Sequence, residues 1–224
     1  MLKRIFLFVA ISSLIWASCT KENNAPAIDF QSNFYPLKIG AVSIFEVDST
    51  AYSNFTNTSV NYKFDIKDSV TNTFEDLAGT TNYRIERYKK VIGSSAWVFQ
   101  LVFTRSKSVR AAEEFVNNQR FIRLIFPPTK GSSWNGNSKN TIGQQDFIIE
   151  DEIAALSLNN LNFDSTLVVN EIDEENLIRE DLVNVTYAKN VGLVKKEVKA
   201  LDKNISTGKI TNGFAYTLKI KSFR

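Results

Sequence analysis

The sequence predicts an all-β protein with one antiparallel domain over residues 34–224. Three observations predict this fold class: several segments alternate apolar and polar residues, turn signals separate them, and helical periodicity is almost absent. A β-sandwich is the alternative architecture, and at most one or two short helices are expected. The length suits a single domain, and 43% hydrophobic residues with 17 Phe are enough for a core.

The clearest strand pattern covers residues 60–67. Its apolar face consists of Val60, Tyr62, Phe64 and Ile66. Its polar face, expected to lie in water, consists of Asn61, Lys63, Asp65 and Lys67. Residues 214–221 and 183–187 show the same alternation, so two more strands are predicted there.

Residues 97–103 form another predicted strand, with larger apolar side chains on one face. We expect this strand to be buried on both sides. The turn at residues 92–95 should join it to residues 83–91 as a hairpin. Weaker strands are expected at 40–48, 82–91, 119–126, 146–150 and 166–170. Short helices are expected at 111–116 and 150–158, where packing would have to support them.

The first 18 residues resemble a bacterial lipoprotein signal peptide with a lipobox. Lys3 and Arg4 precede a 12-residue apolar run, which is shorter than the ~20 residues of a spanning helix. Two small residues then stand directly before Cys19, the single cysteine of the chain. The resemblance implies cleavage before Cys19 and lipid attachment to it. An ordinary secretory cleavage site is the alternative. Residues 19–33 are expected to form the lipidated start and a flexible tether.

Three later segments resemble a widespread group of Bacteroidetes-type lipoproteins. These are Tyr35-Pro36-Leu37-Lys38-Ile39-Gly40, then Phe126-Pro127 through Gly131 to Trp134, then Tyr187 through Gly192 to Glu197. The group has no defined catalytic residue, so the resemblance implies architecture only. That architecture is a curved antiparallel sheet, similar to half-barrel lipid carriers or lipocalins.

Composition excludes several classes of function. The absence of His removes Ser-His-Asp and Cys-His catalysis and the commonest transition-metal ligand. With Cys19 lipidated, neither a thiolate site nor a disulfide is available. The 206 residues from Cys19 onward carry a formal net charge of +1, which gives no reason to expect nucleic acid as a partner. We therefore expect no cofactor, no metal and no enzymatic activity.

Two sets of candidate site residues emerge. An apolar ligand could be lined by six side chains, although an ordinary core needs the same residues: Tyr62, Phe64, Trp97, Phe99, Leu101 and Phe103. Three Asp-Ser motifs resemble O-glycan acceptors of Bacteroidetes-type bacteria, with Ser49, Ser69 and Ser165 as the acceptors. If they are acceptors, these serines should lie on exposed strand ends. The acidic run at 171–175 lacks the spacing of a calcium loop and is expected to be a solvated turn.

The function expected from sequence is that of a non-catalytic binding or accessory module. It would be an outer-membrane lipoprotein on the periplasmic or cell-surface side, held to the membrane by its lipid. Its partner would be an apolar ligand or an envelope protein. A structural lipoprotein with a filled core is one alternative, and a carboxylate-dependent glycan hydrolase is another.

Overall fold

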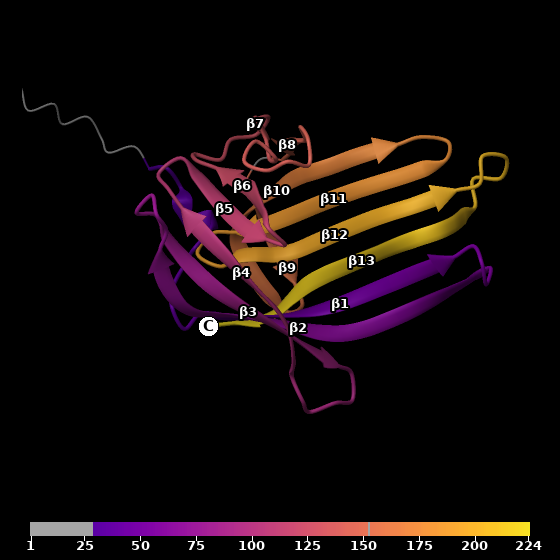
Figure 1. Cartoon of the computed structure of the whole chain (residues 1–224), viewed down its shortest axis with the longest axis horizontal. Helices are drawn as coiled ribbons and strands as arrows, with labels where there is room; N and C mark the ends of the chain where they lie inside the picture. The colour runs from indigo at the N-terminus through magenta and orange to yellow at the C-terminus, as the bar shows by residue number, and fades with distance from the viewer. Residues whose placement is uncertain (1–28, 152) are drawn as a thin grey trace, which may run out of the picture.

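A computed structural model describes residues 29–151 and 153–224 (Figure 1). One short 3-10 turn, η2 (Ser32–Phe34), precedes a series of strands. In chain order they are β1 (Val42–Ser53), β2 (Thr58–Glu75), β3 (Thr81–Val91), β4 (Val98–Lys107), β5 (Ala111–Val116), β6 (Gln119–Ile125), β7 (Ser133–Asn135), β8 (Asp146–Ile149), β9 (Ala154–Leu158), β10 (Leu161–Glu175), β11 (Arg179–Ala188), β12 (Gly192–Lys203) and β13 (Ile210–Phe223). The prediction of an all-β fold is confirmed.

All strands belong to one antiparallel sheet, so the β-sandwich alternative is wrong. The order is β6-β5-β4-β3-β2-β1-β13-β12-β11-β10-β8-β7, and β9 pairs with β10 off this path. The two ends of the path come together: the Ile122 amide donates to the Gly136 carbonyl (2.9 Å), and Trp134 Nε1 donates to the Ile122 carbonyl (2.8 Å). The sheet is therefore nearly closed into a barrel, which agrees with the expected curvature.

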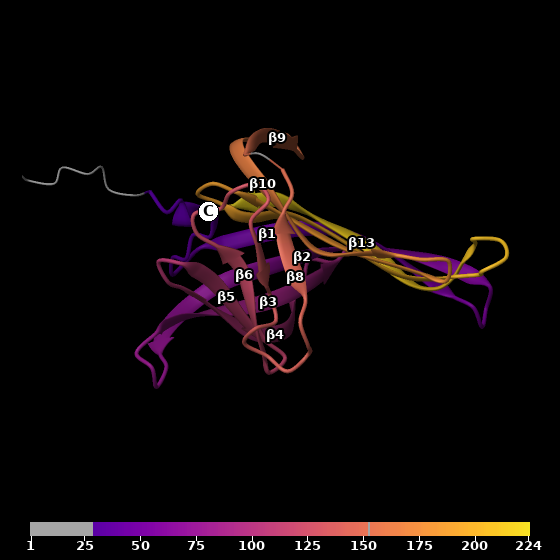
Figure 2. The ribbon, with the colours of Figure 1, turned by 90° about the horizontal axis from the view of Figure 1, so that it is seen from above.

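The barrel is asymmetric, because its strands differ in length. Strands β3 to β6 are wrapped around one end, whereas β1, β2 and β11 to β13 continue well beyond them (Figures 1 and 2). In the second view β9 lies on the opposite side of these long strands from β4. The continuing part of the sheet has no covering layer, and this exposes both of its faces.

The strands expected at 40–48, 60–67, 82–91, 119–126, 146–150, 166–170, 183–187 and 214–221 are all present, most of them longer than expected. The 92–95 hairpin turn also forms, with Ser94 N donating to Val91 O. Both helix predictions are wrong. Residues 111–116 form β5, and β9 occupies residues 154–158. The Ala-rich sequence favours helix locally, but pairing with β4, β6 and β10 overrides that preference.

Two apolar clusters fill the closed end. One joins Leu124 of β6 to Val185 of β11 and Val169 of β10, with Phe34 and Tyr35 packed among them. The other joins Phe45 of β1 to Ile220 of β13. The expected start of the domain at residue 34 falls inside a packed segment. Phe30 contacts the first cluster, and the Asn190 amide donates to the Asn33 carbonyl (2.7 Å).

Candidate functional site

Two cavities at the closed end are small. A cavity of about 180 Å³ lies between residues 35–38 and strands β1 to β4, and one of about 30 Å³ lies among charged side chains nearby. Pockets for small molecules usually measure about 300–1,000 Å³. These two cavities are therefore too small for a lipid chain. A third pocket at the β2–β3 and β4–β5 turns, of about 490 Å³, is open and lined by charged side chains such as Glu113, Arg120 and Lys139.

A charged network occupies part of this end. Arg123 of β6 bridges Glu114 of β5 (3.1 Å) and Glu171 of β10 (3.1 Å), and Arg105 of β4 also binds Glu114 (3.0 Å). Burial alone would raise the pKa of Glu114. Arg123 and Arg105 outweigh that effect and lower it to about 2. No local pattern in the sequence indicated this network, and residue 171 was expected to lie in a solvated turn. Glu171 is buried within β10, so that expectation is wrong for this residue.

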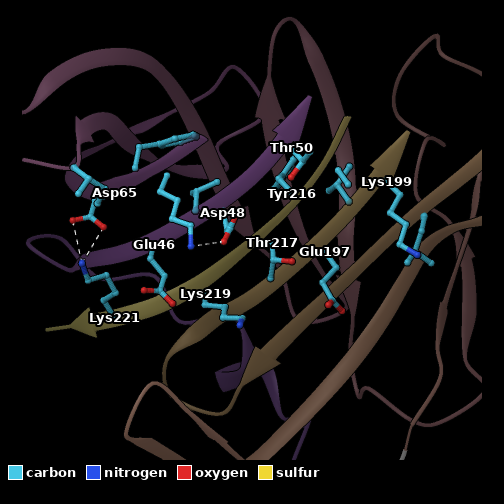
Figure 3. Close-up of a pocket in the computed structure, with 17 residues that line it drawn as sticks. Glu46, Asp48, Thr50, Asp65, Glu197, Lys199, Tyr216, Thr217, Lys219 and Lys221 are labelled. Carbon is cyan, nitrogen blue, oxygen red and sulfur yellow. Dashed lines mark hydrogen bonds and ion pairs between the residues drawn. The ribbon is translucent and has the colours of Figure 1, made fainter. Parts of the chain in front are cut away.

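An open groove of about 560 Å³ runs across β2, β1, β13 and β12 (Figure 3). Its floor comes from strand alternation, since Glu46 and Asp48 alternate with the buried Phe45 and Val47 on β1. The register then sets two rows of polar side chains across the four strands: Lys63, Asp48, Thr217 and Glu197 in one row, and Asp65, Glu46, Lys219 and Lys195 in the next. The groove also contacts the aliphatic residues Ile92 and Leu182.

Most charges in the groove are already paired. Asp48 accepts from Asn61 Nδ2 (2.6 Å) and pairs with Lys63 Nζ (3.0 Å), and these two interactions lower its pKa. Asp65 pairs with Lys221 Nζ (3.0 Å) and with Lys90 Nζ (3.6 Å). Figure 3 shows the pair of Asp65 and Lys221, which joins β2 to β13.

Lys219 is the exception. It stands directly opposite Glu46 in the β1–β13 register, yet the two make no ion pair. Glu46 Oε1 instead accepts from Asn159 Nδ2 (3.0 Å), in the turn between β9 and β10. Among the described residues of the groove, Lys219 is thus a lysine whose ammonium has no carboxylate within 4 Å. The period-two pattern at 214–221 placed it on a polar face but gave no sign of this missing pair.

The six aromatic and aliphatic candidates do not gather at one site. Phe64 borders the groove, Phe103 is buried, and Leu101 and Trp97 are half-buried. Tyr62 and Phe99 are about half exposed. A register shift at Arg87/Tyr88 separates Phe99 from Leu101. Val98, Phe99 and Val102 are exposed, so the expectation that this strand is buried on both sides is wrong.

The polar face predicted at 60–67 needs one correction. Asp65 is only 4% exposed, because lysines from β13 and β3 close over it. On the other face Tyr62 is exposed, because it lies on the uncovered part of the sheet. Tyr62, Phe64, Phe99 and Leu101 therefore do not line one common interior.

The three serine candidates all lie within strands. Ser49 is in β1, Ser69 in β2 and Ser165 in β10, and each is half-buried. They are not at exposed strand ends, and their glycosylation stays a prediction. Cys19 and the signal peptide lie outside the described residues. Across residues 29–151 and 153–224, no cluster of three or more acidic residues could hold a metal ion. No helix in that part of the chain has the length and apolar character needed to cross a membrane.

No family model and no curated protein matches the sequence, so the resemblance to the Bacteroidetes-type group is not confirmed. Similar solved structures include one described as a lipoprotein of Parabacteroides distasonis, with 9% identity, a TM-score of 0.45, and coverage of 85% of this chain and 98% of that one. Another is described as an outer membrane lipoprotein-sorting domain of Vibrio parahaemolyticus (10% identity, TM-score 0.23, 87% and 88% coverage). A LolA superfamily protein of Nitrosomonas europaea follows (11% identity, TM-score 0.22, 88% and 94% coverage). At these TM-scores the likenesses carry no argument about what this chain binds or does.

Proposed function

We propose that this protein is a non-catalytic lipoprotein of the outer membrane that docks an acidic segment of another envelope protein in the groove. The proposal rests on the missing ion pair of Lys219, a cation in the groove floor. Its cross-strand neighbour Glu46 is hydrogen-bonded to Asn159 instead. A partner carboxylate would supply the ion pair that Glu46 does not make with Lys219. Complementary charges of this kind fix register and speed association.

The shape of the groove supports a protein segment. It is open along four antiparallel strands, and it combines paired charges with the aliphatic contacts of Ile92 and Leu182. Protein interfaces that form reversibly have this mixed character, with polar groups around apolar contacts. An extended segment could lie across the strands and place an acidic side chain over Lys219.

The sizes of the cavities argue against an apolar ligand inside the barrel. The space behind residues 35–38 is about 180 Å³ and includes the charged side chains of Asp68 and Arg105. A buried acyl chain would need a larger and drier space. The filled closed end favours a lipoprotein that acts through its surface, and we propose that Cys19 anchors it on the periplasmic or cell-surface side.

A photo-reactive residue at Ala215, which lines the groove, would test the proposal in living cells. A separate variant that carries the same photo-reactive residue at Ala96, in the exposed β3–β4 turn, serves as the position control. We expect a discrete protein adduct from position 215 and none from position 96. The adduct should be lost with Lys219→Glu and kept with Lys209→Glu, an exposed lysine outside the groove.

A binding experiment on the purified mature chain identifies the chemistry. A fluorescent peptide with alternating Asp and Leu should bind at least tenfold more tightly than its Lys-Leu counterpart, and Lys219→Glu should remove the difference. Equal binding of both peptides would contradict the proposal. In the cross-linking experiment, an adduct at position 215 that contains lipid and no protein would also contradict the proposal.

A further inference from the structure

Five charged side chains from five strands converge at the closed end of the barrel. Arg105, Glu114 and Arg123 come from β4, β5 and β6, and Glu171 and Lys196 come from β10 and β12. Arg123 Nη1 donates to both oxygens of Glu171 (3.1 and 3.2 Å), and Lys196 Nζ approaches Glu171 Oε2 (3.6 Å). Strands β4 to β6 lie far from β10 and β12 in the sheet order, so only closure of the barrel brings the two groups of charges together.

The charges of this network do not balance. Three cations, Arg105, Arg123 and Lys196, face two carboxylates, Glu114 and Glu171. The adjacent pair of Arg87 and Asp68 is neutral in itself, with two hydrogen bonds of 2.7 Å. One positive charge is therefore in excess, and the side chains of the three cations are between 13% and 24% exposed. An uncompensated buried charge is unfavourable unless a counter-ion accompanies it.

An unpartnered hydroxyl group faces the same place. Tyr35 is 4% exposed, and its buried Oη makes no hydrogen bond to another group of the described chain. Tyr35 borders the 30 Å³ cavity together with the five charged residues and Tyr187. The Arg105 guanidinium carbon lies 5.5 Å from the centre of the Tyr35 ring. A buried O–H without an acceptor destabilises the fold unless a bound group accepts from it.

The geometry points to a buried site for a small monovalent anion such as chloride in the 30 Å³ cavity, bordered by the Tyr35 hydroxyl, Arg105 and Lys196. The volume is sufficient for about one particle the size of a water molecule. Such an anion accepts from the Tyr35 O–H and offsets the excess charge. Glu114 and Glu171 also line the cavity, but arginine side chains already bind their oxygens.

A neutral water molecule is the competing occupant, because it too could accept from Tyr35. It would leave the excess charge uncompensated, so the two occupants predict different responses to salt. Chloride that binds the folded state raises the melting temperature at constant ionic strength. Water occupancy predicts no dependence on the identity of the anion.

The first measurement compares thermal unfolding of the mature chain in sodium chloride and in sodium gluconate at equal ionic strength. Gluconate is too large for the cavity. We expect chloride to raise the melting temperature by about 3–5 °C at ten times its dissociation constant. Tyr35→Phe should abolish most of this shift, whereas Tyr62→Phe, at an exposed tyrosine, should keep it. Equal melting temperatures in the two salts overturn the inference.

A second measurement stays decisive even if Tyr35→Phe does not fold. Crystals of the wild-type chain soaked in bromide should give an anomalous peak beside Tyr35 Oη and Arg105. Density at that point without an anomalous signal identifies water and overturns the inference. The site is separate from the groove, so its failure would leave the docking proposal unaffected.

Discussion

Arg123 of β6 and Glu171 of β10 form a doubly hydrogen-bonded ion pair across the line where the sheet closes. Replacing Arg123 with Met should destabilise the fold by about 3–5 kcal/mol, because Glu171 and Glu114 would lose a buried partner. Urea unfolding followed by tryptophan fluorescence would measure the loss. Arg120→Met is the matched control, since the Arg120–Glu113 pair at the same strand is more exposed. Its expected loss is below about 1 kcal/mol. Equal losses in both variants would show that the closing pair has no special role.

Glu114 should make stability depend on acid pH. Its folded pKa of about 2 lies below its usual 4.5, so the ionised form favours the folded state. The stabilisation is fully present above about pH 4.5 and is lost as pH falls towards 2. Its full size is about 3 kcal/mol. Melting curves of wild type and Glu114→Gln should differ most near pH 6 and converge near pH 2. A difference that does not change with pH would contradict the assignment.

Phe64→Ala should have a modest effect. Phe64 is half-buried, and Lys89 Nζ lies 3.9 Å from its ring centre. We expect a loss of about 1–2 kcal/mol from apolar contact and the cation–π interaction. A side chain in a fully packed interior would lose about 3–5 kcal/mol. Chemical denaturation distinguishes the two, and the larger value would mean that the sheet is covered at this point in solution.

Gly213→Ala should strongly destabilise the fold. Gly213 has a φ of +107°, and an added Cβ would lie 2.0 Å from the Ala200 carbonyl oxygen on β12. We expect a loss above about 3 kcal/mol or failure to fold. Gly208→Ala is the control, with a φ of +68° and open space around the added carbon. Its loss should be about 1 kcal/mol. A tolerated Gly213→Ala in the soluble fraction would show that β12 and β13 can move apart.

Cys19→Ala tests the anchor. The variant should leave the membrane fraction or keep its signal peptide, because the lipobox would lack its acceptor thiol. Labelling cells with a fatty-acid analogue and fractionating them measures both effects. Ser18→Ala, which keeps a small residue before the cysteine, should behave as wild type. An unlabelled Cys19→Ala chain still held in the membrane would contradict lipid anchoring.

Period-two alternation was enough to predict most of the strands, because it is a local property of the sequence. The burial of Asp65 was not predictable in this way, since its partner Lys221 lies 156 residues away. Arg123 gave no signal either. It stands between Ile122 and Leu124 at a register shift of the β5–β6 pair, which changes the simple alternation of faces. The missing ion pair between Lys219 and Glu46 was not predicted either, because Glu46 binds Asn159, which lies in a turn far away in the sequence.

The position of β13 has a consequence for how the chain folds. This strand lies between β1 and β12, so it joins the two halves of the sheet. Because β1 and β13 are far apart in the sequence, their pairing is intrinsically slow to form. The two halves of the sheet should therefore be joined late in folding, after the hairpins on either side have paired.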